Sequence, residues 1–155
     1  MQGGECPMAE NRNFFIREGT VSDAGPICRL NEEEMGYSFP PEDTLRKMRQ
    51  LLESGSDKIY VAVADDRVVG YVHACDYNLL YAPSMKNIMG IAVLEAYKRR
   101  GIGKALLEEV EVWARKTGCS GVRLVSGATR TGAHAFYRQC GYSGNKMQLN
   151  LKKMF

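Results

Sequence analysis

Basic residues and glycines gather where a helical pattern begins, in the stretch KRRGIGKALL at residues 98–107. An apolar run, NIMGIAVL at residues 87–94, precedes it and has the composition of a buried strand. A strand-to-helix junction leaves backbone N–H groups at the helix start without a carbonyl partner. Together with the helix dipole and the basic side chains, these groups predict a site for a small anion, and a pyrophosphate fits best.

The residues at the junction fit two other phosphate-binding motifs less well. The dinucleotide fingerprint G-x-G-x-x-G would need glycine at the position of Leu106. A Walker P-loop needs Ser or Thr after its lysine, and Ala105 follows Lys104 here. A plain turn without a ligand stays open, because glycine is the usual residue in strained turns.

The patterns around the junction predict an α/β protein with an α+β mixed sheet and helices on its faces. We expect strands at residues 14–20, 58–64, 68–77, 87–94, 121–127 and 146–154, and helices at residues 24–35, 41–54, 101–116 and 132–140. Residues 14–155 are expected to form a single domain, which is long enough for one sizeable core. Residues 1–13 lack an apolar signal core and are expected to be a disordered leader or a cloning remnant.

Composition and charge narrow the classes of function. The net charge of +3 is mild and the basic residues are spread along the chain, which argues against a nucleic-acid partner. No apolar run approaches the ~20 residues of a membrane span, so no membrane partner and a cytoplasmic location are expected. Five cysteines without CxxC spacing and two distant histidines indicate reduced thiols and no metal site.

Two motifs together resemble the GCN5-related N-acetyltransferase (GNAT) family. The family signature is a strand that ends in valine and is followed by [RQ]-x-x-G-x-[GA] at a helix start. The chain has Val93, Gly101 and Gly103 at these places, with Lys98 at the first motif position. The second hallmark is an aromatic pair followed by a glycine and an aromatic residue, and GAHAFYRQCGY at residues 132–142 matches it.

The resemblance implies a GNAT-like fold, in which acetyl-CoA lies between two splayed central strands and donates its acetyl group directly to an amine. Gly90 is the expected position of the bulge that accompanies the splay. The cofactor-binding positions implied by the resemblance are Ile91, Ala92, Val93, Lys98, Arg99, Arg100, Gly101, Ile102, Gly103, Lys104, Arg130 and Tyr137. Tyr137 is also the implied catalytic residue, which would protonate or hydrogen-bond the departing thiolate.

The general base is not specified by the motifs. Many relatives carry a glutamate on the central strand, where this chain has Asn87 and Met89. His73 and Asp76, on the preceding predicted strand and at its end, are candidates, because an imidazole titrates near pH 6.5 and a carboxylate can accept a proton. His73 as an ordinary strand residue, with a water chain as the base, is the alternative.

The expected function is the transfer of an acetyl group from acetyl-CoA to a primary amine of a small molecule or a peptide. A non-catalytic CoA-binding sensor or scaffold is the alternative, because the central glutamate is missing. Self-association is common in the family, and the predicted strand at residues 146–154 offers an edge that a homodimer could use.

Overall fold

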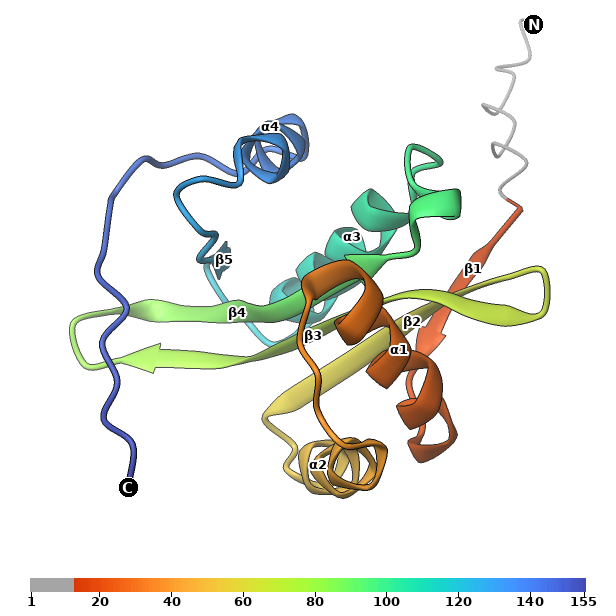
Figure 1. The fold of residues 1–155 in the computed structure, drawn as a ribbon. Coiled ribbons are helices and arrows are strands. Elements are labelled where there is room, and N and C mark those ends of the chain that lie inside the picture. The colour runs from red at the N-terminus through yellow and green to blue at the C-terminus, as the bar shows by residue number, and fades with distance from the viewer. Residues whose placement is uncertain (1–12) are drawn as a thin grey trace, which may run out of the picture.

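A twisted five-stranded sheet with helices on both faces forms the body of the protein (Figure 1). The structure is a computed structural model, and it describes residues 13–155. The predicted leader at residues 1–13 therefore lies, except for its last residue, outside the described residues. The strands are β1 (Phe15–Glu18), β2 (Asp57–Ala64), β3 (Arg67–Leu79), β4 (Ala82–Val93) and β5 (Val122–Leu124). The helices are α1 (Ala24–Met35), α2 (Pro41–Glu53), α3 (Ile102–Lys116) and α4 (Thr131–Gln139), with short 3-10 turns η1 (Val21–Asp23) and η2 (Glu95–Tyr97).

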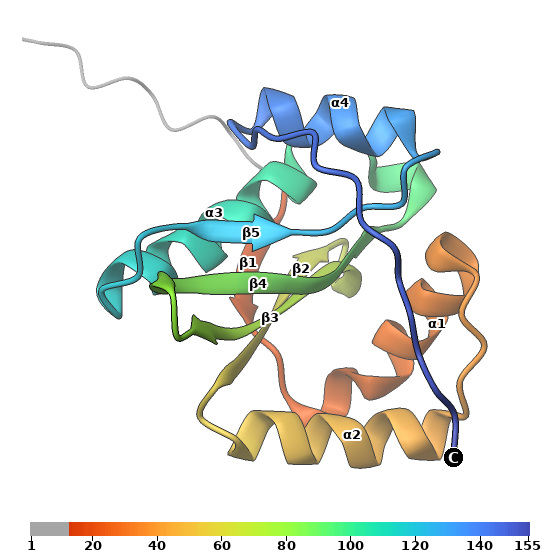
Figure 2. The ribbon, with the colours of Figure 1, turned by 90° about the vertical axis from the view of Figure 1, so that its left-hand side faces the viewer.

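The strands are ordered β1-β2-β3-β4-β5 across the sheet, and only the pair β4–β5 is parallel. β4 and β5 are parallel because the chain between them crosses over through α3. This crossover brings the chain back to the end of the sheet where β4 began. The predicted mixed α/β fold is confirmed. Figure 2 shows α3 on one face of the sheet and α1 with α2 on the other.

Alternating side chains of the central strands supply a core on each face. Val72 and Ala74 pack with Leu106 and Val110 of α3, and all four are completely buried. Tyr71, on the opposite face, joins the cluster formed by α1 and α2. The period of two in β3 therefore fixes which residues face each helix layer.

The hairpin β3–β4 is longer than its sequence predicts. Residues 78–85, which lie between the two predicted strands, continue both strands almost to the tip, where exposed Leu80 and Tyr81 form the turn. The strands extend beyond the sheet because they pair with each other, an interaction that leaves no apolar periodicity in the sequence.

The predicted last strand, residues 146–154, is wrong for this chain. The segment is extended and exposed, and it pairs with no strand among the described residues. Alternation of apolar side chains indicates a strand that has one buried face, but it does not say which chain provides the partner.

Candidate active site

The strands β4 and β5 separate in the middle of the sheet. β5 pairs with β4 over three residues, from Lys86 opposite Val122 to Ile88 opposite Leu124. β4 then continues to Val93 without β5 beside it. The backbone groups of β4 on this side are therefore free to bind an extended ligand that enters between the two strands.

A bulge marks the point of separation. Gly90 lies opposite His73 and Ile88 lies opposite Ala74, so Met89 is an extra residue in β4. The sequence prediction had chosen the neighbouring Gly90. A Cβ at Gly90 would lie 3.3 Å from the hydroxyl oxygen of Tyr71, so a larger residue there would have to displace the Tyr71 side chain.

The loop before α3 presents a concave row of backbone amides. Arg99 and Gly101 both adopt left-handed conformations, with φ of 63° and 83°, and Gly101 caps the helix. Among the described residues, the N–H groups of residues 99–104 find no acceptor. Successive amides in such a turn, at the positive end of a helix dipole, form an anion-binding nest.

The side chains of this loop divide between structure and solvent. Lys98 bridges Glu34 at 3.0 Å and Glu95 at 2.8 Å, and the hydrogen bond to Glu95 is the main reason why the pKa of Lys98 is raised. The guanidinium of Arg100 stacks on the ring of Tyr97, 5.0 Å from its centroid. Arg99 is exposed at the mouth of the loop. Of the predicted cationic ligands, Lys98 is thus already engaged by two carboxylates.

The remaining predicted cofactor residues occupy different environments. Ile102 is buried in the core, so that only its amide can face a ligand. Lys104 is exposed, 3.9 Å from Glu108 one helical turn further on. Arg130 is exposed at the start of α4, where its charge partly offsets the rise that burial causes in the pKa of the Tyr137 phenol.

The helix α4 brings Tyr137 to the side of α3. Its neighbour Phe136 packs directly on α3, where a Cβ on Gly103 would lie only 2.9 Å from the ring. Gly103 therefore permits the close approach of α4 to α3. Tyr137 is half-buried between Phe136 and Tyr142, with ring centroids 5.3 and 6.3 Å away. Burial raises the pKa of Tyr137, which keeps its phenol protonated at neutral pH.

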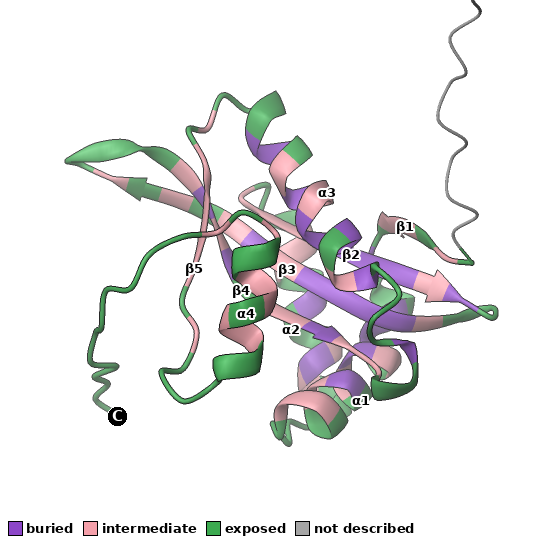
Figure 3. Cartoon of the chain, turned by 90° about the horizontal axis from the view of Figure 1, so that it is seen from above, coloured by how far each residue is buried: buried purple, intermediate pink, exposed green. Residues whose placement is uncertain are grey.

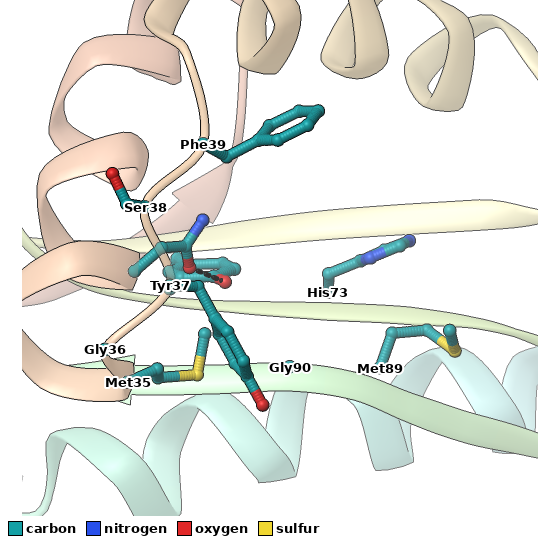
Figure 4. Close-up of a pocket in the computed structure, with 10 residues that line it drawn as sticks. Met35, Gly36, Tyr37, Ser38, Phe39, His73, Met89 and Gly90 are labelled. Carbon is teal, nitrogen blue, oxygen red and sulfur yellow. Dashed lines mark hydrogen bonds between the residues drawn. The ribbon is translucent and has the colours of Figure 1, made fainter. Parts of the chain in front are cut away.

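A pocket of about 490 Å³ lies on the side of β4 that faces α1. It is walled by the end of α1, the loop that follows, β3 and the bulge of β4. Figure 4 shows Tyr37 and Phe39 of that loop on one side and His73 and Gly90 of the strands on the other. Tyr71 closes the floor and donates a hydrogen bond to Asn31, and burial raises the pKa of Tyr71 to about 12.

His73 lines this pocket and is held by a carboxylate. Its Nε2 lies 2.7 Å from Oδ1 of Asp57 on β2. Burial alone would raise the pKa of Asp57, but hydrogen bonds from His73, Ser54 and Ser56 outweigh it and lower the pKa. No pattern in the sequence indicated Asp57, because only the pairing of β2 with β3 brings it to His73. Asp76, the other candidate base, is paired with the buried Lys86.

A pair of splayed parallel strands beside a helix start with free amides is the arrangement that the resemblance to the GNAT family implies. The chain belongs to the acetyltransferase (GNAT) family, whose model matches residues 26–142. The resemblance seen in the two motifs is therefore confirmed, and so is the prediction of an acyl-CoA-dependent acetyltransferase.

Known relatives agree with this assignment. The chain is 29% identical over 132 residues to aminoglycoside N(6')-acetyltransferase type 1 of Stenotrophomonas maltophilia, covering 82% of this chain and 84% of that protein. It is 31% identical over 103 residues to an N-alpha-acetyltransferase of Sulfolobus acidocaldarius, covering 62% of this chain but only 59% of that one. An aminoglycoside acetyltransferase solved with a CoA-S-monomethyl-acetylneamine bisubstrate analogue has the same fold, with TM-score 0.81, 18% identity and coverage of 92% and 99%.

No helix in residues 13–155 has the length and apolar character to cross a membrane. No group of three or more His, Cys, Asp or Glu side chains in that same part of the chain is arranged to hold a metal ion.

Proposed function

We propose that this protein transfers the acetyl group of acetyl-CoA to a primary amine of a small molecule. The observation that carries the proposal is the row of free amides at residues 99–104, placed beside the unpaired end of β4. The amides fit a pyrophosphate, and the strand fits the extended pantetheine arm that follows it. The solved relative that holds a bisubstrate analogue supports acetyl-CoA and an amino sugar as the pair of substrates.

The residues divide the binding of acetyl-CoA between them. Backbone groups of Ile91, Ala92 and Val93 would hold the arm and the thioester carbonyl, and the amides of residues 99–104 would hold the diphosphate. Arg99, Arg100 and Arg130 are exposed around this path and would add charge. Acetyl-CoA supplies an activated acyl group, so that a bond from the amine nitrogen to the acyl carbon forms as the carbon–sulfur bond breaks.

Tyr137 would act on the leaving group. Its phenol is half-buried and keeps its proton, because burial raises its pKa. A neutral phenol can give a proton or a hydrogen bond to a thiolate, and such general acid catalysis is typically worth about 10²–10⁴ in rate. The hydroxyl of Tyr137 is not used by any hydrogen bond within the described residues, so it is available for this role.

His73 would accept the proton from the amine. Asp57 is a carboxylate and can only accept, so Nε2 of His73 carries the hydrogen in the neutral ring. Nδ1 is then the free base. This pair replaces the glutamate that many relatives have on the central strand, and it reaches the site from β3, opposite the bulge of β4.

The pocket beside His73 favours a small acceptor. Its volume of about 490 Å³ lies in the range of small-molecule sites, roughly 300–1,000 Å³. Tyr37 and Phe39 supply apolar walls, and the exposed Glu32 and Glu33 on the adjoining end of α1 favour a cationic amine. An amino sugar or a polyamine has this combination of size and charge. A peptide amine is the second candidate, supported by the archaeal relative.

The proposal is tested by measuring CoA release from acetyl-CoA with aminoglycosides, polyamines and short peptides as acceptors. We expect release to be stimulated at least about tenfold by one small amine class over peptides. Calorimetry on the same sample measures acetyl-CoA binding. Binding without stimulated release across all three classes would favour the non-catalytic sensor, and absence of binding would remove the proposal entirely.

A further inference from the structure

An arginine on β5 lies on the same face of the sheet as the pocket. Arg123 is the neighbour of Asn87 in the parallel pair β4–β5, so the two side chains point to the same face. Lys86 and Ile88, on either side of Asn87, are buried on the face that α3 covers. Arg123 therefore lies on the opposite face, where His73 lines the pocket.

Two contacts hold the guanidinium of Arg123 in place. Its Nη1 donates a hydrogen bond to Oδ1 of Asn87 at 2.5 Å, and its Cζ lies 4.2 Å from the centroid of the Tyr77 ring. Nδ2 of Asn87 in turn lies 3.0 Å from the sulfur of Met89. Figure 4 shows Met89 beside His73 at one end of the pocket. Contacts between side chains thus lead from the pocket to the guanidinium.

The positive charge of Arg123 is not neutralised by either contact, because one partner is an amide and the other a neutral ring. No carboxylate pairs with Arg123 in the part of the chain that the structure describes. A guanidinium presents a planar fork of N–H donors that fits a carboxylate or a phosphate. A side chain that is already held in one orientation loses less entropy when it binds such a group.

The strands set the distance between this charge and the proposed base. Cys75, two residues beyond His73, lies opposite Asn87, which lies beside Arg123. Two residues along a strand at ~3.3 Å each and two strand spacings of ~4.8 Å place the Cα atoms of His73 and Arg123 about 12 Å apart. A molecule that reaches both side chains therefore needs several bonds between its two functional groups.

The surface between the two side chains is open to such a molecule. Figure 3 shows the β3–β4 hairpin extending beyond α1 and α2, with exposed residues towards its tip. Tyr77 and Arg123 are only partly buried. On the α1 side of the pocket, the exposed Glu32 and Glu33 carry the opposite charge. The path across the pocket thus runs from an acidic end to a basic end.

We propose that Arg123 binds an anionic group, a carboxylate or a phosphate, on the acceptor whose amine reacts beside His73. The inference rests on the amine acetylation proposed above and narrows its acceptor to a small amine that also carries a negative charge. Polyamines lack that group. Asn87 is a positioning residue: its neutral amide orients the guanidinium, whereas a carboxylate at position 87 would neutralise the charge that the ligand needs.

Matched acceptors test the charge. The anionic compounds are ω-aminohexanoate and ω-aminohexyl phosphate, and their neutral counterparts of similar length are ω-aminohexanamide and ω-aminohexanol. We expect kcat/KM to be at least about tenfold higher for an anionic compound than for its counterpart, because hydrogen bonds to charged groups are the stronger ones. Comparison of the two anionic compounds shows whether the site prefers a carboxylate or a phosphate.

Variants of Arg123 test whether this residue causes the preference. We expect Arg123→Ala to bring the ratio of the two kcat/KM values close to one, and Arg123→Glu to invert it. The matched control is Arg46→Ala, which removes an exposed arginine of α2 and should keep the wild-type ratio. Far-UV circular dichroism and the Kd for acetyl-CoA check that the variants are folded.

Calorimetry with ω-aminohexanoate and ω-aminohexyl phosphate, in the presence of CoA, gives a readout that does not need turnover. Binding that is lost in Arg123→Ala, without acceptor-stimulated CoA release in the wild type, would support the anion site and remove the proposed function. Equal wild-type values for anionic and neutral compounds would overturn the anion site. So would a preference that survives in Arg123→Ala, or the absence of binding by both anionic compounds.

Discussion

Two side chains on opposite sides of β4 have the chemistry that acetyl transfer requires. Tyr137 on α4 is a phenol that burial keeps protonated, and His73 on β3 is an imidazole oriented by Asp57. One can give a proton and the other can take one, and the bulged strand β4 lies between them. The separation of acid and base by a strand suits a reaction in which the donor and the acceptor enter from different sides.

The role proposed for Tyr137 predicts a specific kinetic effect. Tyr137→Phe keeps the ring that packs between Phe136 and Tyr142 and removes only the hydroxyl. We expect kcat to fall at least about tenfold, within the range of general acid catalysis, while the Kd for acetyl-CoA stays within about twofold. Steady-state rates and calorimetry measure the two quantities. An unchanged kcat, once chemistry is shown to limit the rate, would leave Tyr137 as a packing residue.

The pair His73–Asp57 predicts a graded loss. His73→Gln removes the base, and we expect kcat/KM to fall about 10²-fold or more. Asp57→Asn keeps the shape but no longer fixes the hydrogen on Nε2, so a smaller loss, about tenfold, is expected. Exogenous imidazole should restore part of the activity of a His73→Gly variant. If His73→Gln turns over at the wild-type rate, proton removal takes place elsewhere, for instance through water.

Asp23 predicts how stability depends on pH. It accepts hydrogen bonds from Arg17 at 2.8 and 2.9 Å and from the amide of Thr20 at 2.8 Å. Burial would raise the pKa of Asp23, but these bonds outweigh it and lower the pKa from 3.8. The stabilisation is therefore present above about pH 4 and is lost as the pH falls through the lower, folded value.

We expect Asp23→Asn to lower the free energy of unfolding at pH 7 by about 1–3 kcal/mol. The dependence of the variant on pH should be flatter than that of the wild type at acid pH. Urea titrations at a series of pH values measure both effects. Asp43→Asn is the control, because its bond to Arg46 is exposed and such pairs contribute ~0–1 kcal/mol. Equal losses in the two variants would contradict the assignment.

The turn before α3 shows that neighbouring glycines can have different causes. Gly101 has a positive φ and open space where a Cβ would be, so its constraint is conformational. Gly103 has an ordinary helical backbone, and its constraint is the ring of Phe136 on α4. Gly101 shapes the loop before α3, and Gly103 sets how closely α4 approaches α3.

The two glycines should consequently fail in different ways. Gly101→Ala places a side chain in the left-handed region, at a cost of roughly 1–2 kcal/mol in the free energy of folding. We expect the Kd for acetyl-CoA to rise while α4 stays undisturbed. Gly103→Ala pushes Phe136 away, at roughly 1–3 kcal/mol for overpacking, and we expect a loss in kcat because Tyr137 moves with α4. Denaturant unfolding and calorimetry separate these effects. A Gly103→Ala variant with normal kcat, or a Gly101→Ala variant with normal Kd, would show that the elements tolerate the change.

Across the whole molecule, the sequence predicted the elements better than it predicted their partners. The helices α1 and α2 follow capping and apolar spacing, which are local, and their predicted bounds agree with the structure. The long hairpin β3–β4 and the unpaired segment at residues 146–154 depend on which strand lies next to which, and no local pattern contains that information. For the same reason the two glycines of the loop were found, whereas Asp57, which approaches His73 only through strand pairing, was not.

Acetyl-CoA that binds between β4, the loop before α3 and α4 would contact all three of these parts of the chain at once. The amides before α3, the free end of β4 and the exposed side of α4 would all line the proposed path. A ligand that binds only the folded state stabilises it, by about 2.7 kcal/mol at 100 times its Kd. For a chain of this length each kcal/mol raises Tm by about 2–4 °C, which predicts a rise of about 5–10 °C.

Thermal melts with acetyl-CoA, CoA, ATP and NAD at equal concentrations test this expectation. Acetyl-CoA and CoA carry both a diphosphate and a pantetheine arm, so we expect each of them to give the full predicted rise in Tm. ATP and NAD offer phosphates to the loop but have no pantetheine arm to lie along β4, so their effect should be under about 2 °C. Gly101→Ala should reduce the rise with acetyl-CoA. An equal rise with NAD would mean that the loop alone selects the ligand, and that the splayed strands have no part in recognition.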